Sequence, residues 1–206
     1  MATALTTLVT NTGYLLGITP SASTVPTSTE ITQWLKDAQR DMLNRLPSRF
    51  LYKRVVRETT GTSLASPYNV ADYSSIDIAK IRSGVLYDSS GTSYHQCKVI
   101  QNIEEFNNLI LTDSSNPMYQ YIISWDPNDG KVYCFPTGAT GDKLYLTYLL
   151  DIDGTDINYE LEEQTERLAC FYAAAMHSIG QVGDYLGVGQ KFLTMYELGI
   201  KSLGGR

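Results

Sequence analysis

Few residues of this chain combine a type and a spacing that could do chemistry. His95 and Cys97 stand two apart on a predicted strand, so their side chains should share one face. A nucleophilic or metal-binding pair also needs a third ligand or an orienting carboxylate, which the surrounding sequence does not supply. His177 lies in a predicted helix without such a partner. We interpret all three as structural residues.

Acidic residues gather at two further places. Glu160 and Glu163 suggest the acid and base of a glycosidase, but crowded carboxylates over 160–166 are more typical of a helix start, where the helix dipole favours negative charge. The segment DPNDG at 126–130 lacks the ligand spacing and the closing Glu of a calcium loop, so it predicts a hairpin turn. We therefore expect no catalytic residue, no metal and no cofactor.

The segment DIDGT at 151–155 directly follows the apolar run LYLTYLL. It resembles the opening motif of haloacid-dehalogenase-like phosphatases, in which the first Asp attacks a phosphoryl group and the second acts as acid and base beside magnesium. Those enzymes need a doubly wound α/β domain after the motif. Only 51 residues follow Thr155, and they predict helices. We therefore interpret DIDGT as an acidic turn.

Charge is unevenly distributed along the chain. The 206 residues carry a net charge of −6, yet residues 1–60 hold seven basic and four acidic groups, whereas residues 151–206 hold four and nine. An acidic chain is a poor candidate for tight nucleic-acid binding, which depends on Lys and Arg at phosphates. Unlike patches favour self-association instead. The first 29 residues carry no charge, which predicts no export signal, and no apolar run is long enough to cross a bilayer.

Both ends of the chain predict helices. Leu5, Leu8, Leu15 and Leu16 suggest a short first helix closed by Gly17, and residues 17–29 predict a linker. Thr27 and Glu30 form a capping-box pattern. It precedes an apolar face of Ile31, Leu35, Ala38, Met42 and Leu46, which ends at Pro47. After residue 155, one helix with the acidic residues of 160–166 in its first turns and a Tyr-rich last helix are predicted.

The middle of the chain predicts strands. Short runs rich in Val, Ile, Tyr and Thr alternate with turns at 89–91 and 126–130, and one helix is predicted to start at Asn102. Some strands are apolar on both faces, among them Tyr121, Ile123 and Trp125 opposite Ile122. Such strands are covered twice, by a second sheet, by helices or by a neighbouring subunit. The three cysteines, Cys97, Cys134 and Cys170, predict neither a disulfide framework nor a zinc site.

The order of these segments carries a resemblance. Four segments follow one another: a capped helix containing AQRDML, a β region that ends in LYLTYLLD, an acidic helix start that leads into FYAAAM, and a Tyr-rich last helix. This order resembles that of the head-to-tail adaptor (connector) proteins of tailed phages. The likeness covers roughly residues 27–203. It implies a helical bundle with a β insertion, and a ring, usually of twelve subunits, between portal and tail.

We accordingly predict an α+β fold, with a discontinuous helical bundle from residues 1–47 and 156–206 and a β-rich insertion, antiparallel and sandwich-like, at 48–155. The expected function is a structural virion protein of the neck, assembled in the host cytoplasm. It would bind the portal above and a tail or nozzle protein below, and it would line a DNA passage without sequence-specific or membrane binding. Carbohydrate binding or cell-wall hydrolysis by the β region is the alternative, and a DxDGT phosphatase is a third.

Two sets of residues are predicted to make the contacts of such a ring. Opposite charges would meet between neighbouring subunits. The basic set is Arg45, Arg49, Lys53, Arg54 and Arg57, and the acidic set is Asp151, Asp153, Glu162, Glu163 and Glu166. The portal would be bound by the C-terminal residues Leu198, Ile200, Lys201, Leu203 and Arg206, a segment expected to be disordered or rearranged in the free subunit because Gly199, Gly204 and Gly205 weaken a helix.

Overall fold

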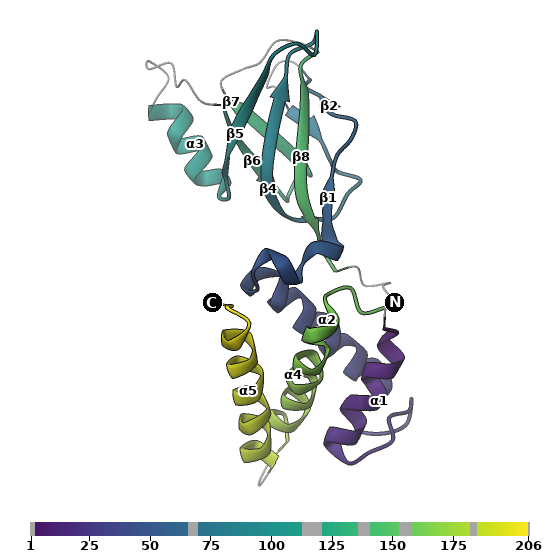
Figure 1. The fold of residues 1–206 in the computed structure, drawn as a ribbon. Coiled ribbons are helices and arrows are strands. Elements are labelled where there is room, and N and C mark those ends of the chain that lie inside the picture. Colours follow the sequence, from purple (N-terminus) through teal and green to yellow (C-terminus); the bar gives the residue numbers. More distant parts are fainter. Residues whose placement is uncertain are drawn as a thin grey trace. The chain divides into compact units, whose positions relative to one another are not determined.

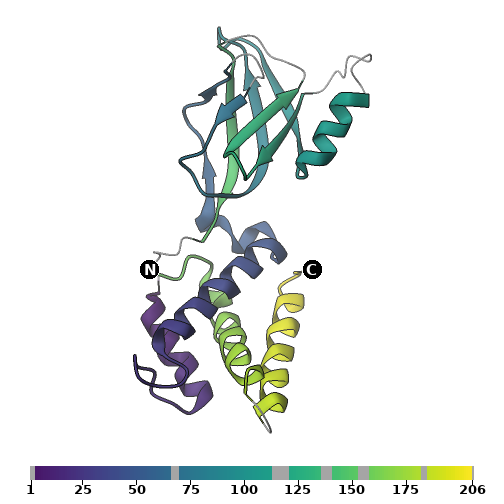
Figure 2. The same ribbon diagram turned by 180° about the vertical axis from the view of Figure 1, so that it is seen from behind.

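The computed structural model describes residues 3–65, 70–112, 121–135, 141–152, 158–181 and 185–205. The chain is mixed α+β, which confirms the predicted fold class. It divides into two compact units, a helical unit of Met1–Arg54 with Ile152–Arg206 and a β unit of Val55–Asp151 (Figures 1 and 2). The unit boundaries fall at Arg54 and Ile152, whereas we expected 47 and 156. Two 3-10 turns, Ser48–Phe50 and Tyr52–Arg54, stay with the helices, since Phe50 and Leu51 are buried.

The helical unit begins with α1 (Leu5–Leu16) and α2 (Ser28–Arg45). Gly17 ends α1 with a φ of 70°, a left-handed conformation that glycine adopts without strain. The predicted capping box at the start of α2 is confirmed, because the Thr27 hydroxyl accepts from the Glu30 N–H while the Glu30 carboxylate accepts from the Thr27 N–H. All five predicted core positions are buried, four of them within α2 and the fifth, Leu46, at its C-cap.

The unit is completed by α4 (Glu166–Ile179) and α5 (Tyr185–Ser202). Figures 1 and 2 show α4 between α1 and α5, and α4 also packs on α2. The three consecutive alanines Ala173–Ala175 are fully buried, so neighbouring helices approach α4 closely. The prediction that Glu160, Glu162 and Glu163 occupy the first turns of this helix is wrong. A 3-10 turn, Glu163–Thr165, precedes α4, and Glu166 is the acidic residue of its first turn.

The β unit is built on one curled sheet. Its strands are β1 (Val55–Arg57), β2 (Thr62–Ser63), β3 (Val70–Asp72), β4 (Ile78–Tyr87), β5 (Tyr94–Ile100), β6 (Ile122–Asp126), β7 (Lys131–Phe135) and β8 (Lys143–Leu150). Among the described residues their order is β1-β8-β4-β5-β6-β7-β3, with β2 also paired to β8. The β5–β6 pair is parallel and the other pairs are antiparallel. Both predicted hairpins, β4–β5 and β6–β7, are confirmed.

The predicted double covering of strands is confirmed for β6. Ile123 points into the main core of the β unit, together with Leu144, Leu146 and Tyr148 of β8. Ile122 points the other way, into a small cluster with Phe106 of α3 (Ile103–Thr112). The second cover of β6 therefore comes from a helix of the same unit, as Figure 1 shows. The predicted cap of α3 is present, because the Asn102 side chain accepts a hydrogen bond from the Glu104 N–H.

The described helices include none with the length and apolar character needed to cross a membrane.

Candidate functional site

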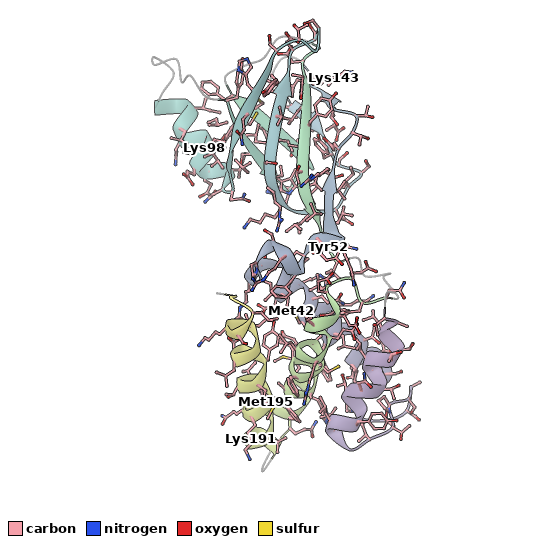
Figure 3. All side chains as sticks on the ribbon, viewed as in Figure 1. Met42, Tyr52, Lys98, Lys143, Lys191 and Met195 are labelled. Carbon is pink, nitrogen blue, oxygen red and sulfur yellow. The ribbon has the colours of Figure 1, made fainter. Side chains whose placement is uncertain are left out.

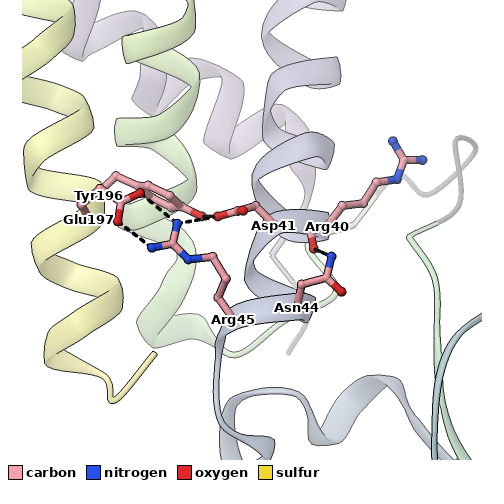
Figure 4. Close-up of polar contacts among 6 residues, drawn as sticks. All are labelled: Arg40, Asp41, Asn44, Arg45, Tyr196 and Glu197. Atoms are coloured by element: carbon pink, nitrogen blue, oxygen red, sulfur yellow. Dashed lines mark hydrogen bonds and ion pairs between the residues drawn. The ribbon is translucent and has the colours of Figure 1, made fainter. Parts of the chain in front are cut away.

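The best-defined polar cluster of the helical unit joins α2 to α5 (Figure 4). The Arg45 guanidinium donates to both carboxylate oxygens of Glu197, at 2.8 and 2.5 Å, and to Asp41 at 3.1 Å. Asp41 also accepts a 2.5 Å hydrogen bond from the Tyr196 hydroxyl. A bidentate pair of this kind fixes the geometry of both partners. The cluster therefore sets how α5 sits on α2.

The contacts of this cluster shift the pKa values of its members. The hydrogen bond to Glu197 raises the pKa of Arg45, and the same contact lowers the pKa of the Glu197 carboxyl. Burial, reinforced by the hydrogen bond to Asp41, raises the pKa of the Tyr196 hydroxyl. All three groups thus keep their ordinary protonation at neutral pH. Arg45, which we predicted to face a neighbouring subunit, pairs within its own chain.

Three more residues of the predicted basic set also have partners within the helical unit. The Arg49 guanidinium donates to the Leu203 carbonyl at 3.1 Å. Lys53 donates to the Leu161 carbonyl at 2.9 Å, and its ammonium lies 3.9 Å from the Glu162 carboxylate. Arg54 forms an ion pair with Glu160 at 3.4 Å and is buried. Arg57, the fifth residue, lies exposed on β1 in the β unit.

The predicted acidic set is also partly paired within its own chain. Glu162 pairs with Lys53, whereas Glu163 is exposed and Glu166 half-buried at the start of α4. Asp151 ends the β unit, where its N–H donates to the Asp77 carbonyl at 2.9 Å. Asp153 lies outside the described residues. Charge pairing between copies stays a prediction; among the described residues of the two sets, Arg49, Lys53, Arg57 and Glu163 are exposed.

The C-terminal residues predicted to bind the portal differ in exposure. Leu198 is 61% exposed and Lys201 is also exposed, but Ile200 is fully buried and Leu203 half-buried. Ile200 therefore packs within its own chain, and its side chain is not presented to a partner in this structure. The helix α5 continues through Gly199 to Ser202, because the missing side chain of Gly199 lets Leu168 of α4 pack against it. Arg206 lies outside the described residues.

The residues considered for catalysis are not brought together. His95 is exposed, and its ring lies against that of Tyr121, tilted by 39° with 4.9 Å between ring centroids, while Cys97 is buried in the core of the β unit. Cys134 lies in the same core, and its contact with Cys97 raises the pKa of the Cys134 thiol. Within the described part of the chain, no three His, Cys, Asp or Glu side chains come together as metal ligands would. Residues 153–155 of DIDGT lie outside that part.

Sequence reasoning missed the outer face of α5. Val188, Met195 and Leu198 are 42%, 49% and 61% exposed, and they recur at helical spacing on the side of α5 that faces away from Tyr196 and Ile200. The signal was available, because the last helix is apolar at more positions than one buried face requires.

No family model matches the chain, and no curated protein matches it significantly.

Proposed function

We propose that this chain is a structural subunit of a tailed-phage virion, an adaptor that forms a dodecameric ring between the portal and the tail. The observation that supports the proposal most is the composition of the two units. Residues from both ends of the chain form one compact helical unit, and the residues between them form a β unit. A helical bundle made from both chain ends and carrying a β-rich insertion is the arrangement expected of an adaptor, and it is part of this proposal.

The proposed contacts use the end of α5, where Lys201 is exposed and Leu203 half-buried. The portal is bound by the end of α5, at Lys201, Leu203 and the residues that follow. A tail or nozzle protein binds on the opposite side of the ring. DNA passes through the centre without sequence-specific contact, and the acidic net charge of −6 suits a passage that does not retain DNA.

The test is electron microscopy of the purified chain, alone and mixed with the portal protein encoded in the same genome. We expect rings of this chain stacked on one face of the portal. A matched pair of variants locates the contact: Lys201→Glu should weaken binding to the portal, whereas Lys143→Glu, an exposed change on β8 of the β unit, should leave it intact. A truncation after Glu197 is unsuitable, because it removes the buried Ile200. Absence of any portal complex with the wild-type chain would refute the proposal.

A second candidate function, carbohydrate binding by the β unit, is favoured by one cavity. A space of about 390 Å³ is lined by Trp125, Asn128 and the carboxylates Asp77, Asp129 and Asp151. An aromatic ring with nearby carboxylates and amides offers both a stacking surface and hydrogen-bond acceptors for a sugar. Retention of the chain on insoluble cell wall, lost in Trp125→Ala, would favour this function. Release of soluble muropeptides would indicate a hydrolase.

A further inference from the structure

An exposed apolar stripe runs along α5. The residues Val188, Lys191, Met195, Leu198 and Ser202 follow one another at spacings of three and four, and all are exposed. This is the spacing of a coiled-coil seam. The stripe spans the 15 residues from Val188 to Ser202, or about 21 Å of helix. Figure 3 labels Lys191 and Met195 on this helix. Within the helical unit, the opposite face of α5 is occupied by Tyr196 and Ile200, which are buried.

A groove of matching character lies between α1 and the start of α4. A space of about 400 Å³ is lined on α1 by Leu8, Asn11 and Leu15, which lie on one face at helical spacing. Leu8 is buried and forms the floor, whereas Leu15 is half-buried and Asn11 is exposed. Two apolar side chains at the base and a polar rim make a surface that an apolar helix face can fill.

The rim of the groove is complementary in charge to the stripe. Glu163 and Glu166 line the groove, and Arg167 lies beside them, which leaves a net charge of −1. The guanidinium of Arg167 is held over the Phe171 ring at 5.3 Å. The stripe carries Lys191 in its middle. The Glu197 carboxylate of α5 is engaged by Arg45 of the same chain. Unlike charges therefore face each other if a stripe enters a groove.

The two surfaces have no residue in common. Figures 1 and 2 show α1 and α5 on different sides of α4, so one copy can use its stripe and its groove at the same time. A contact between two different surfaces is heterologous, and repeated around an axis it generates a ring or an open chain. We infer that the α5 stripe of one copy packs into the α1–α4 groove of the next copy, and that this is the contact that builds the ring; the inference rests on the proposed function. It assigns Leu198 and Ser202 to the neighbouring copy and leaves Lys201, Leu203 and the residues that follow for the portal.

Sedimentation velocity of two complementary variants tests this inference. Met195→Asp places a charge in the stripe and leaves the groove intact. Asn11→Trp fills the groove and leaves the stripe intact. Both positions are exposed, so circular dichroism should show an unchanged fold. The wild-type chain should associate as its concentration rises to about 1 mM, and each variant should associate at least tenfold more weakly, about 1.4 kcal/mol. Val25→Asp, a change at a residue that is 76% exposed outside both surfaces, is the control and should behave as wild type.

The decisive measurement is sedimentation velocity of an equimolar mixture of Met195→Asp and Asn11→Trp. Each variant lacks one surface, so an equimolar mixture should form a dimer through the intact stripe of one protein and the intact groove of the other, and growth should stop there. A wild-type chain that stays monomeric at 1 mM overturns the inference. So does a mixture that stays monomeric, or an Asn11→Trp variant that dimerises alone, which would mean that stripe packs on stripe. Electron microscopy with the portal protein distinguishes a failure of this inference from a failure of the proposed function. If Met195→Asp still forms rings on the portal, the stripe–groove contact is wrong while the proposed function stands.

Discussion

Gly199 of α5 offers a sharp test of the packing between α4 and α5. A Cβ added there would lie 2.2 Å from Cδ2 of Leu168, 3.2 Å from its Cδ1 and 3.3 Å from its Cγ. Leu168 is buried, with 9% of its surface exposed. Rotation of one methyl group does not relieve all three contacts, so the Leu168 side chain must move as a whole or the helices must separate. Gly199→Ala should therefore lower the free energy of unfolding of the helical unit.

Two opposing effects determine how much Gly199→Ala changes the free energy of unfolding. Replacing glycine by alanine inside a helix is favourable by about 1 kcal/mol through the backbone. Forcing a methyl group into a packed interior costs about 1 to 3 kcal/mol. We expect a net destabilisation of about 1 kcal/mol. Gly187 of the same helix is the matched control, because no atom lies within 4 Å of its added Cβ, so Gly187→Ala should stabilise by about 0.5 to 1 kcal/mol.

Urea unfolding, monitored by tryptophan fluorescence, measures the change in unfolding free energy of the helical unit by itself. The chain has two tryptophans, Trp34 in the helical unit and Trp125 in the β unit. In a Trp125→Phe background, the fluorescence of Trp34 reports on the helical unit alone. The two alanine variants should differ by about 2 kcal/mol, and this difference isolates the packing cost because the backbone effect largely cancels. A Gly199→Ala variant as stable as Gly187→Ala would refute the contact between Gly199 and Leu168.

Three further predictions concern single side chains. Glu197→Gln should lower the unfolding free energy by about 0.5 to 1 kcal/mol at pH 7, because water screens a pair that is 39% exposed at Glu197. Since Arg45 lowers the pKa of Glu197 below 4.5, the pair stabilises above that pH, and urea titrations should show the difference from wild type disappearing as the pH falls through the folded-state pKa. Thr27→Ala should cost about 1 kcal/mol by circular dichroism while Thr27→Ser costs little, since only the hydroxyl caps α2. The hydrogen bond to Asp129 raises the pKa of Tyr133 to about 12. The stabilising effect of this hydrogen bond should therefore be complete below pH 10 and lost as the pH rises toward 12. Asp129→Asn should lower the pKa of Tyr133 in a ¹³C tyrosine NMR titration.

Local patterns predicted the local structure well. The Thr27 and Glu30 capping box, the buried face of α2 and the turns of both hairpins are encoded within a few residues, and the structure confirms them. The cap of α3 at Asn102 is of the same kind. Capping and turn chemistry act over one helical turn or one hairpin, so the sequence alone identifies them.

Charge patterns predicted less, because their partners lie far away in the sequence. The acidic residues before α4 were expected to complement a helix dipole. Glu160 instead pairs with Arg54, a partner 106 positions earlier in the chain, and Glu162 lies beside Lys53. A basic and an acidic segment suggest a pairing, but they do not say whether the partner is in the same copy or in the next. Part of the charge asymmetry that we assigned to subunit contacts is used within the helical unit.

Apolar patterns raise the same question, and here the structure answers it in two ways. An element that is apolar on two faces needs two partners, or one face stays exposed to water. The two faces of β6 are both covered within the β unit, by the core around Ile123 and by α3 at Ile122. In α5, the inner face around Tyr196 is covered by α4 and α2, while Met195 and Leu198 stay exposed on the outer face. The sequence signal is the same in both elements, and only the packing of the folded chain distinguishes a satisfied second face from one that is available to another copy.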